Sequence, residues 1–248
     1  MTVQLVLSLF PGIGLLDQAF EAHGFCVVRG PDLLWGGDVC TFLPPASRFD
    51  GVIGGPPCQA FSRLRHLVEA KGLNTAPNLI PHFERIVAAA GPRWFVMENV
   101  DAAPLPAVEG YRVQTQRLAD HWCGGATGRI RRFSFGWLGE DAPRFYVEGK
   151  VLVPTNPRPA VTATGGREVP VKRGGSGKVK STWRRGPRGA AYLAQAIRDQ
   201  GLPEGFLGEA PFTLAGKIKA IGNGVPLPMG NAVAAEVRAA LGRVEGQE

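Results

Sequence analysis

The chain has 248 residues, a hydrophobic content of 44% and a net charge of +7. That composition suits one domain with a buried core, and the lack of any run of about 18 apolar residues excludes a transmembrane helix and favours a protein without a membrane partner. The four cysteines show neither a Cys-x-x-Cys pair nor metal-ligand spacing, so we expect reduced thiols in a cytoplasmic protein, and no metal site.

The charge is unevenly distributed along the chain. Residues 1–60 are acidic to neutral, whereas residues 167–188 are rich in Lys and Arg, with Glu168 as their one acidic residue. A basic second part suits a polyanion that is bound on one side. A solvated loop without a partner has the same composition, and the charge alone does not separate the two interpretations.

The first segment predicts a strand, a glycine turn and a helix. Residues 3–10 are mostly apolar, as in a strand that is covered on both faces. The run Pro-Gly-Ile-Gly at 11–14 follows, and apolar side chains then recur at helical spacing from Leu15 to Phe20. Such a unit brings backbone amides and a helix N-terminus to a ligand. A glycine turn that serves packing alone would have the same pattern.

Residues 25–28 predict a second short strand. Asp32 lies past its end, where a carboxylate can hold a pair of ribose hydroxyls, although a plain turn aspartate also fits. Asp38 follows two glycines near Trp35, and a carboxylate there can accept a hydrogen bond from an adenine amino group. Too few residues separate Asp32 from Asp38 for a full crossover helix, so we expect this unit to be abbreviated.

Residues 49–58 predict a buried strand that ends in a stiff loop. Residues 49–53 are short and mostly apolar, and the run Gly-Gly-Pro-Pro at 54–57 ends the strand abruptly. Cys58 follows at the carboxyl end of the strand, where open α/β sheets place their ligand chemistry. A lone cysteine is more often a small buried hydrophobe. Two glycines and two prolines in front of it favour a chemical role instead.

A helix is predicted over residues 75–90, and a strand over residues 93–97 that ends at Glu98. A carboxylate at the end of a buried strand is costly unless it is hydrogen-bonded or protonated. An arginine partner would give Glu98 a purely structural role. Because Glu98 is expected at the same sheet edge as Cys58, we favour a chemical one.

Residues 111–118 and 131–137 alternate between apolar and polar side chains, which predicts a hairpin across the glycine-rich segment 124–128. Arg129, Arg131 and Arg132 lie at the start of its second strand. One surface arginine usually serves solubility. Three arginines beside a glycine turn fit contacts with phosphates or bases better.

The remainder of the chain divides into a lobe and a returning segment. Residues 139–189 are rich in Pro, Gly and basic residues, which predicts loops without an independent core. Helices are expected at 190–200 and 229–241, with a tight Gly-Asn-Gly turn at 222–224 ahead of the second. We therefore expect a catalytic part at 1–138, a small lobe at 139–189 and a C-terminal segment at 190–248 that returns to the first part.

Taken together, six segments resemble the C5-cytosine DNA methyltransferase family, and they follow the family's order. They resemble its S-adenosylmethionine loop, adenine-binding Gly-Asp element, nucleophile loop, Glu-Asn-Val element, Gln-x-Arg-x-Arg element and C-terminal Gly-Asn-Ser-Val element: residues 9–14, 37–39, 54–62, 98–100, 127–131 and 222–226. Besides Gly224 in place of Ser in the last element, two departures from the family stand out. Thr127 stands in place of the usual Gln, and Pro31 displaces the acidic residue after the second strand.

The resemblance implies a fold and a cofactor. The fold would be the α/β, Rossmann-like fold of S-adenosylmethionine-dependent methyltransferases, with a small, basic, loop-rich second lobe. The cofactor would be S-adenosylmethionine. The residues implied to contact it are Phe10, Gly12, Ile13, Gly14, Asp32, Asp38, Val39, Pro57, Asn223 and Val225.

The resemblance also implies a covalent mechanism. Cytosine C5 is too weak a nucleophile to take a methyl group directly, and a Cys58 thiolate added at C6 would activate it. Glu98 would hold the ring N3 and the exocyclic amine, and Arg131 would contact O2. Arg129 would help to place Cys58 and a nearby phosphate. The ring is out of reach inside a duplex, so the cytosine must be flipped out.

The partner implied is double-stranded DNA, bound by a monomer. Gln59 and Ser62 flank the nucleophile and are predicted to contact DNA, and Arg184 and Arg185 to make salt-dependent phosphate contacts. Residues 158–164 resemble the conserved segment that follows target recognition, so only about residues 139–157 remain for sequence readout. We therefore expect a short or relaxed target and a restriction-modification, orphan or phage role.

Three alternatives stay open at this point. The first is an RNA cytosine-5 methyltransferase of the same fold that acts on tRNA. The second is a catalytically idle nucleic-acid-binding protein that keeps the fold, against which intact Cys58 and Glu98 argue. The third is an enzyme of the same fold that transfers another group from a modified cofactor.

Overall fold

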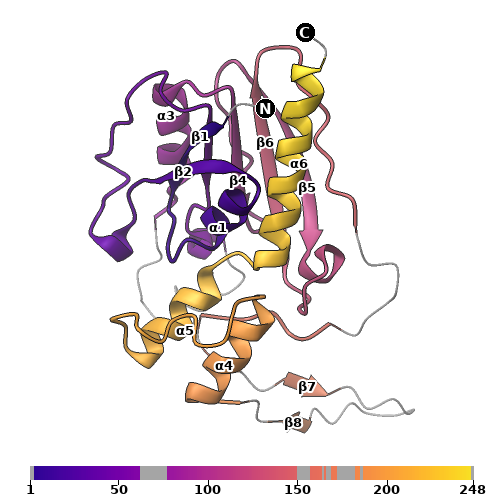
Figure 1. Cartoon of the computed structure of the whole chain (residues 1–248). Helices are drawn as coiled ribbons and strands as arrows, with labels where there is room; N and C mark the ends of the chain where they lie inside the picture. The colour runs from indigo at the N-terminus through magenta and orange to yellow at the C-terminus, as the bar shows by residue number, and fades with distance from the viewer. Residues whose placement is uncertain are drawn as a thin grey trace.

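A six-stranded sheet forms the centre of the computed structural model (Figure 1). The structure describes residues 3–61, 77–149, 157–163, 165, 169–171, 182–184 and 187–246. The strands of the sheet lie in the order β2-β1-β3-β4-β6-β5, and their bounds are β1 (Gln4–Leu9), β2 (Phe25–Arg29), β3 (Gly51–Gly54), β4 (Trp94–Asn99), β5 (Tyr111–Ala119) and β6 (Ile130–Leu138). The α-helices are α1 (Leu15–Ala22), α3 (Ile80–Ala90), α4 (Gly189–Asp199), α5 (Leu214–Asn223) and α6 (Leu227–Glu245), and the short 3-10 helices are η1 (Leu33–Trp35), η2 (Cys58–Phe61) and η3 (Asp120–Cys123).

The sheet is parallel on one side and antiparallel on the other. β1 pairs in parallel with β2 and β3, and β3 pairs in parallel with β4. β6 runs antiparallel to both β4 and β5, so the predicted hairpin is confirmed. β1 to β5 therefore all end at the same edge of the sheet. The α/β, Rossmann-like fold expected from the sequence is confirmed by this arrangement.

Helices cover both faces of the sheet. α1 and α6 lie against one face and α3 against the other (Figure 1). β4 shows the sequence basis, because Trp94 and Val96 belong to the core that contains α6, whereas Phe95 and Met97 belong to the core that contains α3. A strand that is buried on both faces has a continuous apolar run, and residues 94–97 form such a run.

The connection between β2 and β3 contains a single turn of 3-10 helix, η1, and no crossover α-helix. This confirms the abbreviated unit that the spacing of Asp32 and Asp38 predicted. The chain after η1 is held by Arg85 of α3, whose guanidinium donates to the carbonyl oxygens of Val39 at 2.9 Å and Phe42 at 3.0 Å. One helical side chain thus fixes a loop that has lost its own helix.

α4 and α5 lie in a small lobe below the carboxyl edge of the sheet, whereas α6 runs alongside the sheet (Figure 1). α4 and α5 pack there around their own apolar cluster, which includes Val161, Ile197 and Ile221. Two predictions need correction. Residues 220–223 are the last turn of α5, a helix that the sequence analysis missed, and the segment expected to be loops contains the antiparallel strands β7 (Val169–Val171) and β8 (Thr182–Arg184).

The division into residues 1–138, 139–189 and 190–248 stays a prediction. α6 of the last part packs against α1 of the first, in one shared core. Within the residues that the structure describes, none of the helices combines the length and the apolar character that crossing a bilayer requires.

A glycine in β6 allows one of these cores to close. A Cβ on Gly136 would lie 2.1 Å from the ring of Phe95 on the neighbouring strand, a ring that also contacts Phe83. Gly136→Ala should therefore lower the free energy of unfolding by about 1–3 kcal/mol, because the ring must leave its place. Urea denaturation measures this loss.

Gly149→Ala is the matched control for that substitution, because the nearest atom to its new Cβ would be a carbonyl oxygen 4.0 Å away. An equal loss of stability in both variants would contradict the packing argument.

Candidate active site

The strand order places a crevice between β1 and β3. From β1 the chain moves to β2 on one side, and from β3 it moves to β4 on the other. The loops that leave β1 and β3 therefore diverge at the carboxyl edge, which is where open α/β sheets bind their ligands. The loop after β1 is residues 10–14, and the loop after β3 is residues 55–61.

The loop after β1 exposes its backbone. Phe10, Gly12 and Gly14 all have positive φ angles, of 56°, 56° and 77°. A Cβ on Gly12 would meet no atom within 4 Å, so this residue borders open space. The Gly12 amide donates to Asp32 Oδ2 at 2.8 Å, and the Gly12 carbonyl accepts from Trp35 Nε1 at 2.7 Å. Asp32 and Trp35, at the two ends of η1, therefore hold the loop through the amide and the carbonyl of Gly12.

Asp32 has a structural role in this arrangement. Besides the Gly12 amide, its carboxylate accepts from the amide of Leu34 at 2.7 Å and so caps η1. Both carboxylate oxygens thus have a backbone donor, and each keeps a free lone pair that a ligand hydroxyl can use. The turn-aspartate interpretation and the ligand interpretation are both compatible with this geometry.

A buried network anchors the same loop from below. Asp17 in α1 accepts from Ser8 Oγ at 2.5 Å and from Arg29 Nε at 3.0 Å. Its side chain is fully buried, and this burial raises the pKa of the carboxyl group. A Cβ on Gly14 would lie 2.7 Å from Arg29 Nη2, so the guanidinium packs directly under the loop. The sequence analysis assigned no role to Asp17 or Arg29.

The other predicted cofactor residues line the neighbouring loops. Asp38 is exposed, and the Cys40 amide that donates to its Oδ1 at 2.9 Å lowers the pKa of its carboxyl group. Val39 is buried beside it. Asn223 is exposed at the end of α5, and Val225 is buried just past it. Because a Cβ on Gly224 would lie 2.5 Å from Leu15 Cδ1, this segment packs beside the end of loop 10–14, to which Ile13 also belongs.

Cys58 begins η2 and is half-buried. The loop that carries it is fixed from β4, because Asn99 Nδ2 donates to the carbonyl oxygen of Pro56 at 3.1 Å. Asn99 is itself 1% exposed. The sequence analysis placed it in a family element without naming this contact. Pro57, which lies between Pro56 and Cys58, is half-buried.

Glu98 lies under the same loop. Its Oε1 pairs with Arg131 Nε at 2.7 Å, and the two side chains are 11% and 16% exposed. Its Oε2 would be 3.0 Å from a Cβ on Gly55, which explains a glycine at that position. The arginine partner required for a structural carboxylate is therefore present. The pair also lies at the end of the strand next to the one that carries Cys58, as the chemical interpretation requires.

Arg129 is the most deeply buried cation of the site. Its Nη1 donates to the carbonyl oxygens of Val161 at 2.9 Å and Gly222 at 3.0 Å. The pKa of the guanidinium is lowered to about 10, mainly by burial and then by the positive Arg131, while interaction with Glu98, Cys58 and Asp120 opposes the shift. Its Nε has no hydrogen-bond partner among the described residues. This burial favours the role beside Cys58 over a contact with a surface phosphate.

The structure describes two of the four residues that are predicted to contact DNA. Gln59 is exposed directly after Cys58. Arg184 is the last residue of β8. Ser62 and Arg185 lie outside the described residues. These four contacts stay predictions.

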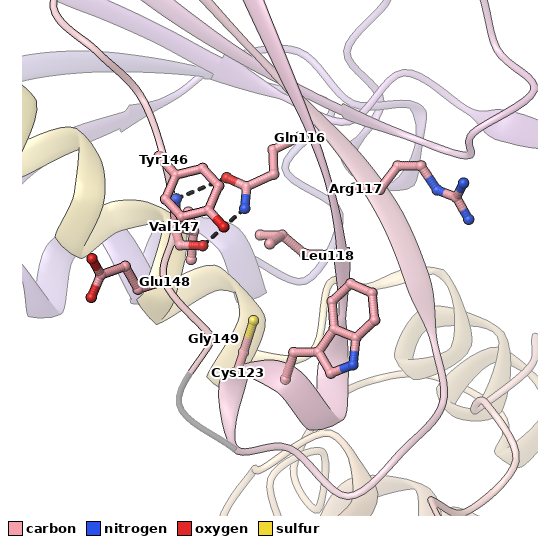
Figure 2. Close-up of a pocket in the computed structure, with 9 residues that line it drawn as sticks. Gln116, Arg117, Leu118, Cys123, Tyr146, Val147, Glu148 and Gly149 are labelled. Atoms are coloured by element: carbon pink, nitrogen blue, oxygen red, sulfur yellow. Dashed lines mark hydrogen bonds between the residues drawn. The ribbon is translucent and has the colours of Figure 1, made fainter. Parts of the chain in front are cut away.

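A separate cavity of about 310 Å³ lies at the outer edge of the sheet (Figure 2). β5, η3 and the segment 146–149 line it, and Leu118 and Cys123 are buried in its wall. The Gln116 carboxamide exchanges two hydrogen bonds of 2.8 Å with the backbone of Val147 and so fixes one wall. None of the residues predicted for the site lines this cavity.

Comparison with known proteins assigns these segments to one family. The family model for C-5 cytosine-specific DNA methylases matches residues 41–106, which include the Cys58 loop and Glu98. Type II methyltransferase M.HgiGI of Herpetosiphon aurantiacus is 33% identical over 123 residues, which are 41% of this chain and 94% of that protein. M.HgiDI of the same organism is 32% identical over 161 residues, or 52% of this chain and 51% of that protein. The chain thus spans only about half of M.HgiDI.

Solved structures support the same fold. Methyltransferase EhMeth of Entamoeba histolytica superposes with a TM-score of 0.65 at 13% identity, over 97% of this chain and 99% of that chain. Dnmt2 methyltransferase of S. pombe superposes with a TM-score of 0.61 at 12% identity, over 98% of this chain and 99% of that chain. At these identities the likeness concerns the fold alone.

The Asn99–Pro56 hydrogen bond can be tested by stability. Asn99→Ala leaves a buried carbonyl oxygen without its donor, which should cost about 1–3 kcal/mol of unfolding free energy. Urea denaturation measures the loss, and limited alkylation of Cys58 reports whether the loop has opened. A variant as stable as the parent would contradict the assigned bond.

Proposed function

Because the chain belongs to the C-5 cytosine-specific DNA methylase family, we propose that it transfers a methyl group from S-adenosylmethionine to C5 of a flipped cytosine in DNA. The reaction proceeds through a covalent adduct between Cys58 and C6. One observation carries the proposal. Cys58 is held on a fixed loop at the carboxyl edge of the sheet, and the Glu98–Arg131 pair lies on the next strand.

The crevice fits S-adenosylmethionine, the methyl donor of this family. Gly12 borders open space at the switch point of the sheet, so a ligand can approach the backbone there. Asp32 and Asp38 present carboxylate oxygens from neighbouring loops, suited to hydroxyl and amino groups, and Phe10 and Val39 supply apolar surface. Ile13, Gly14, Pro57, Asn223 and Val225 complete the set. When bound, the cofactor supplies an electrophilic methyl group to cytosine C5.

The residues of this chain activate the base. The Cys58 thiolate adds to C6, and the electron pair of the C5–C6 bond becomes available at C5. Arg129 is the buried cation that we assign to the neighbourhood of Cys58. After methylation, C5 loses its proton to a base such as water, and the returning electron pair expels Cys58 as the thiolate.

Glu98 and Arg131 hold the base during this change. A carboxyl group that shares a proton with the ring N3 and accepts from the exocyclic amine stabilises the electron density that thiolate addition pushes into the ring. Arg131 keeps the Glu98 side chain oriented through its 2.7 Å contact, and we assign it the contact with O2. Both side chains are largely buried, so water competes little with these contacts.

DNA is the proposed substrate, since relatives such as M.HgiDI and M.HgiGI are named as type II methyltransferases and the matching family model is one for DNA methylases. The cytosine must leave the duplex, because the ring face that Cys58 attacks is stacked inside it. Gln59, exposed beside Cys58, is a proposed DNA contact, as are Ser62, Arg184 and Arg185. The short segment at 139–157 suits a short or relaxed target sequence. We further propose a monomer that acts in the cytoplasm.

Cys58→Ala should abolish the activity, because no other side chain of the described site can form the adduct. We expect plasmid DNA from cells that express the parent chain to contain 5-methylcytosine, and DNA from the variant to contain at least roughly a thousandfold less. Mass spectrometry of the nucleosides measures both. Bisulfite sequencing of the same DNA identifies the target.

Cys26→Ala is the matched control, since Cys26 is an exposed thiol on β2. Unmodified DNA from the parent chain would remove the proposal for DNA, and the same measurement on tRNA would test the RNA alternative. A new cytosine mass other than a single methyl group would keep the mechanism and change the transferred group.

Glu98→Gln should lower kcat about 10²- to 10³-fold with little change in KM, because an amide cannot pass a proton to the ring N3, and that proton matters mainly in the transition state. Tritium transfer from labelled cofactor to duplex DNA measures both constants. Glu236→Gln is the control, since it breaks a glutamate–arginine pair of the same 2.7 Å length on α6. Equal effects in the two variants would contradict a chemical role for Glu98.

A further inference from the structure

Asp120 is a buried carboxylate that the proposed mechanism leaves unused. It begins η3, directly after β5, and its side chain is wholly shielded from solvent. Its Oδ2 accepts two hydrogen bonds from Thr127, from the amide at 2.9 Å and from the hydroxyl at 2.7 Å. Its Oδ1 has no partner among the described residues. Burying a carboxylate in this way lowers the free energy of unfolding, so stability does not explain why Asp120 lies there.

The contacts of Asp120 converge on the start of β6. Its amide donates to the carbonyl oxygen of Arg129 at 2.8 Å, and its own carbonyl accepts from Gly125 at 2.9 Å. Thr127 Oγ1 accepts from the Arg129 amide at 3.4 Å. A Cβ on Gly125 would lie 1.9 Å from Asp120 Oδ1, so the turn folds tightly over the carboxylate. Asp120 and Thr127 together set the point at which β6 begins.

The register of β6 decides where two catalytic arginines point. Arg129 lies directly before β6 and sends its guanidinium into the site, and Arg131 is the second residue of the strand and pairs with Glu98. Neighbouring residues of a strand face opposite ways, so a shift by one residue would remove Arg131 from Glu98. Thr127 is also the position at which this chain departs from the family's Gln-x-Arg-x-Arg element.

We propose that Asp120, acting through Thr127, is a positioning residue that holds Arg129 beside Cys58 and Arg131 against Glu98. The pair of hydrogen bonds clamps the turn at both its start and its end, and the buried guanidinium then reaches the Val161 and Gly222 carbonyls. The inference rests on the proposed function only for its effect on methyl transfer. The effect on Cys58 itself does not depend on any activity.

The test removes the Thr127 hydroxyl and measures the reactivity of Cys58. Thr127→Val keeps the size of the side chain, and Thr127→Ala serves if the valine variant does not fold. We expect iodoacetamide to alkylate Cys58 about 3- to 10-fold more slowly, because a cysteine reacts faster when a cation lies beside its sulfur. Peptide mass spectrometry reads each cysteine separately. The exposed Cys26 and Cys40 are references within the same molecule and should react at unchanged rates.

Two further variants separate positioning from general loss of structure. Thr127→Ser restores the hydroxyl and should return Cys58 to within about threefold of the parent rate. Ser134→Ala removes another buried hydroxyl of β6, one without a hydrogen-bond partner among the described residues, and should change nothing. Unchanged Cys58 reactivity in Thr127→Val, parallel slowing of Cys26 and Cys40, or an equal effect of Ser134→Ala would each overturn the proposal.

Single-turnover methyl transfer supplies the second readout. Thr127→Val should lower the rate at least tenfold while KM for S-adenosylmethionine stays within about twofold, and Thr127→Ser should recover it. If the parent chain transferred no methyl group but its Cys58 still responded to Thr127→Val, the positioning role would stand and the proposed function would fall.

Discussion

A buried positive charge governs this structure. Arg129 is 5% exposed, and its guanidinium joins the start of β6 to two backbone carbonyls that lie 32 and 93 residues further along the chain. An unpaired charge in such a place is costly, and carbonyl dipoles compensate only part of that cost. Glu98 and Asp120 supply the remaining negative field. The site can therefore exist only where several separate segments meet around this cation.

The apolar core of the sheet and its helices offsets the free energy that the buried charges around Arg129 cost. The sheet is apolar on both faces, and α1, α3 and α6 cover it with large side chains such as Phe20, Phe83 and Met229. Polar chemistry is confined to the carboxyl edge, where loops can deviate from regular pairing. This separation explains why Glu98 can end a strand that is otherwise continuous core.

The sequence predicted the site better than the lobe that completes it. The run at 54–58 and the Glu98–Asn99 pair can be recognised from residues that are adjacent in the sequence. The strand at 93–97 can be predicted in the same way, because its apolar side chains are consecutive. Arg85, Asp17 and Asp120 could not, because each acts across the fold on a segment that is distant in sequence or hidden in a turn. α5 was missed because Gly222 and Gly224 resemble a loop. Gly222 is instead required by contact, since a Cβ there would lie 2.3 Å from the backbone of Ala163.

The Gly222 carbonyl also links the site to the order in which the chain is made. Synthesis delivers the nucleophile loop, the Glu98 strand and both arginines long before α5 and α6 emerge from the ribosome. Until then Arg129 lacks one of its two carbonyl partners, and α1 lacks the helix that covers it. α5 and α6 thus complete a site built from segments that are made earlier, so a nascent chain from which α5 has not yet emerged cannot hold its charges in the arrangement that the reaction needs.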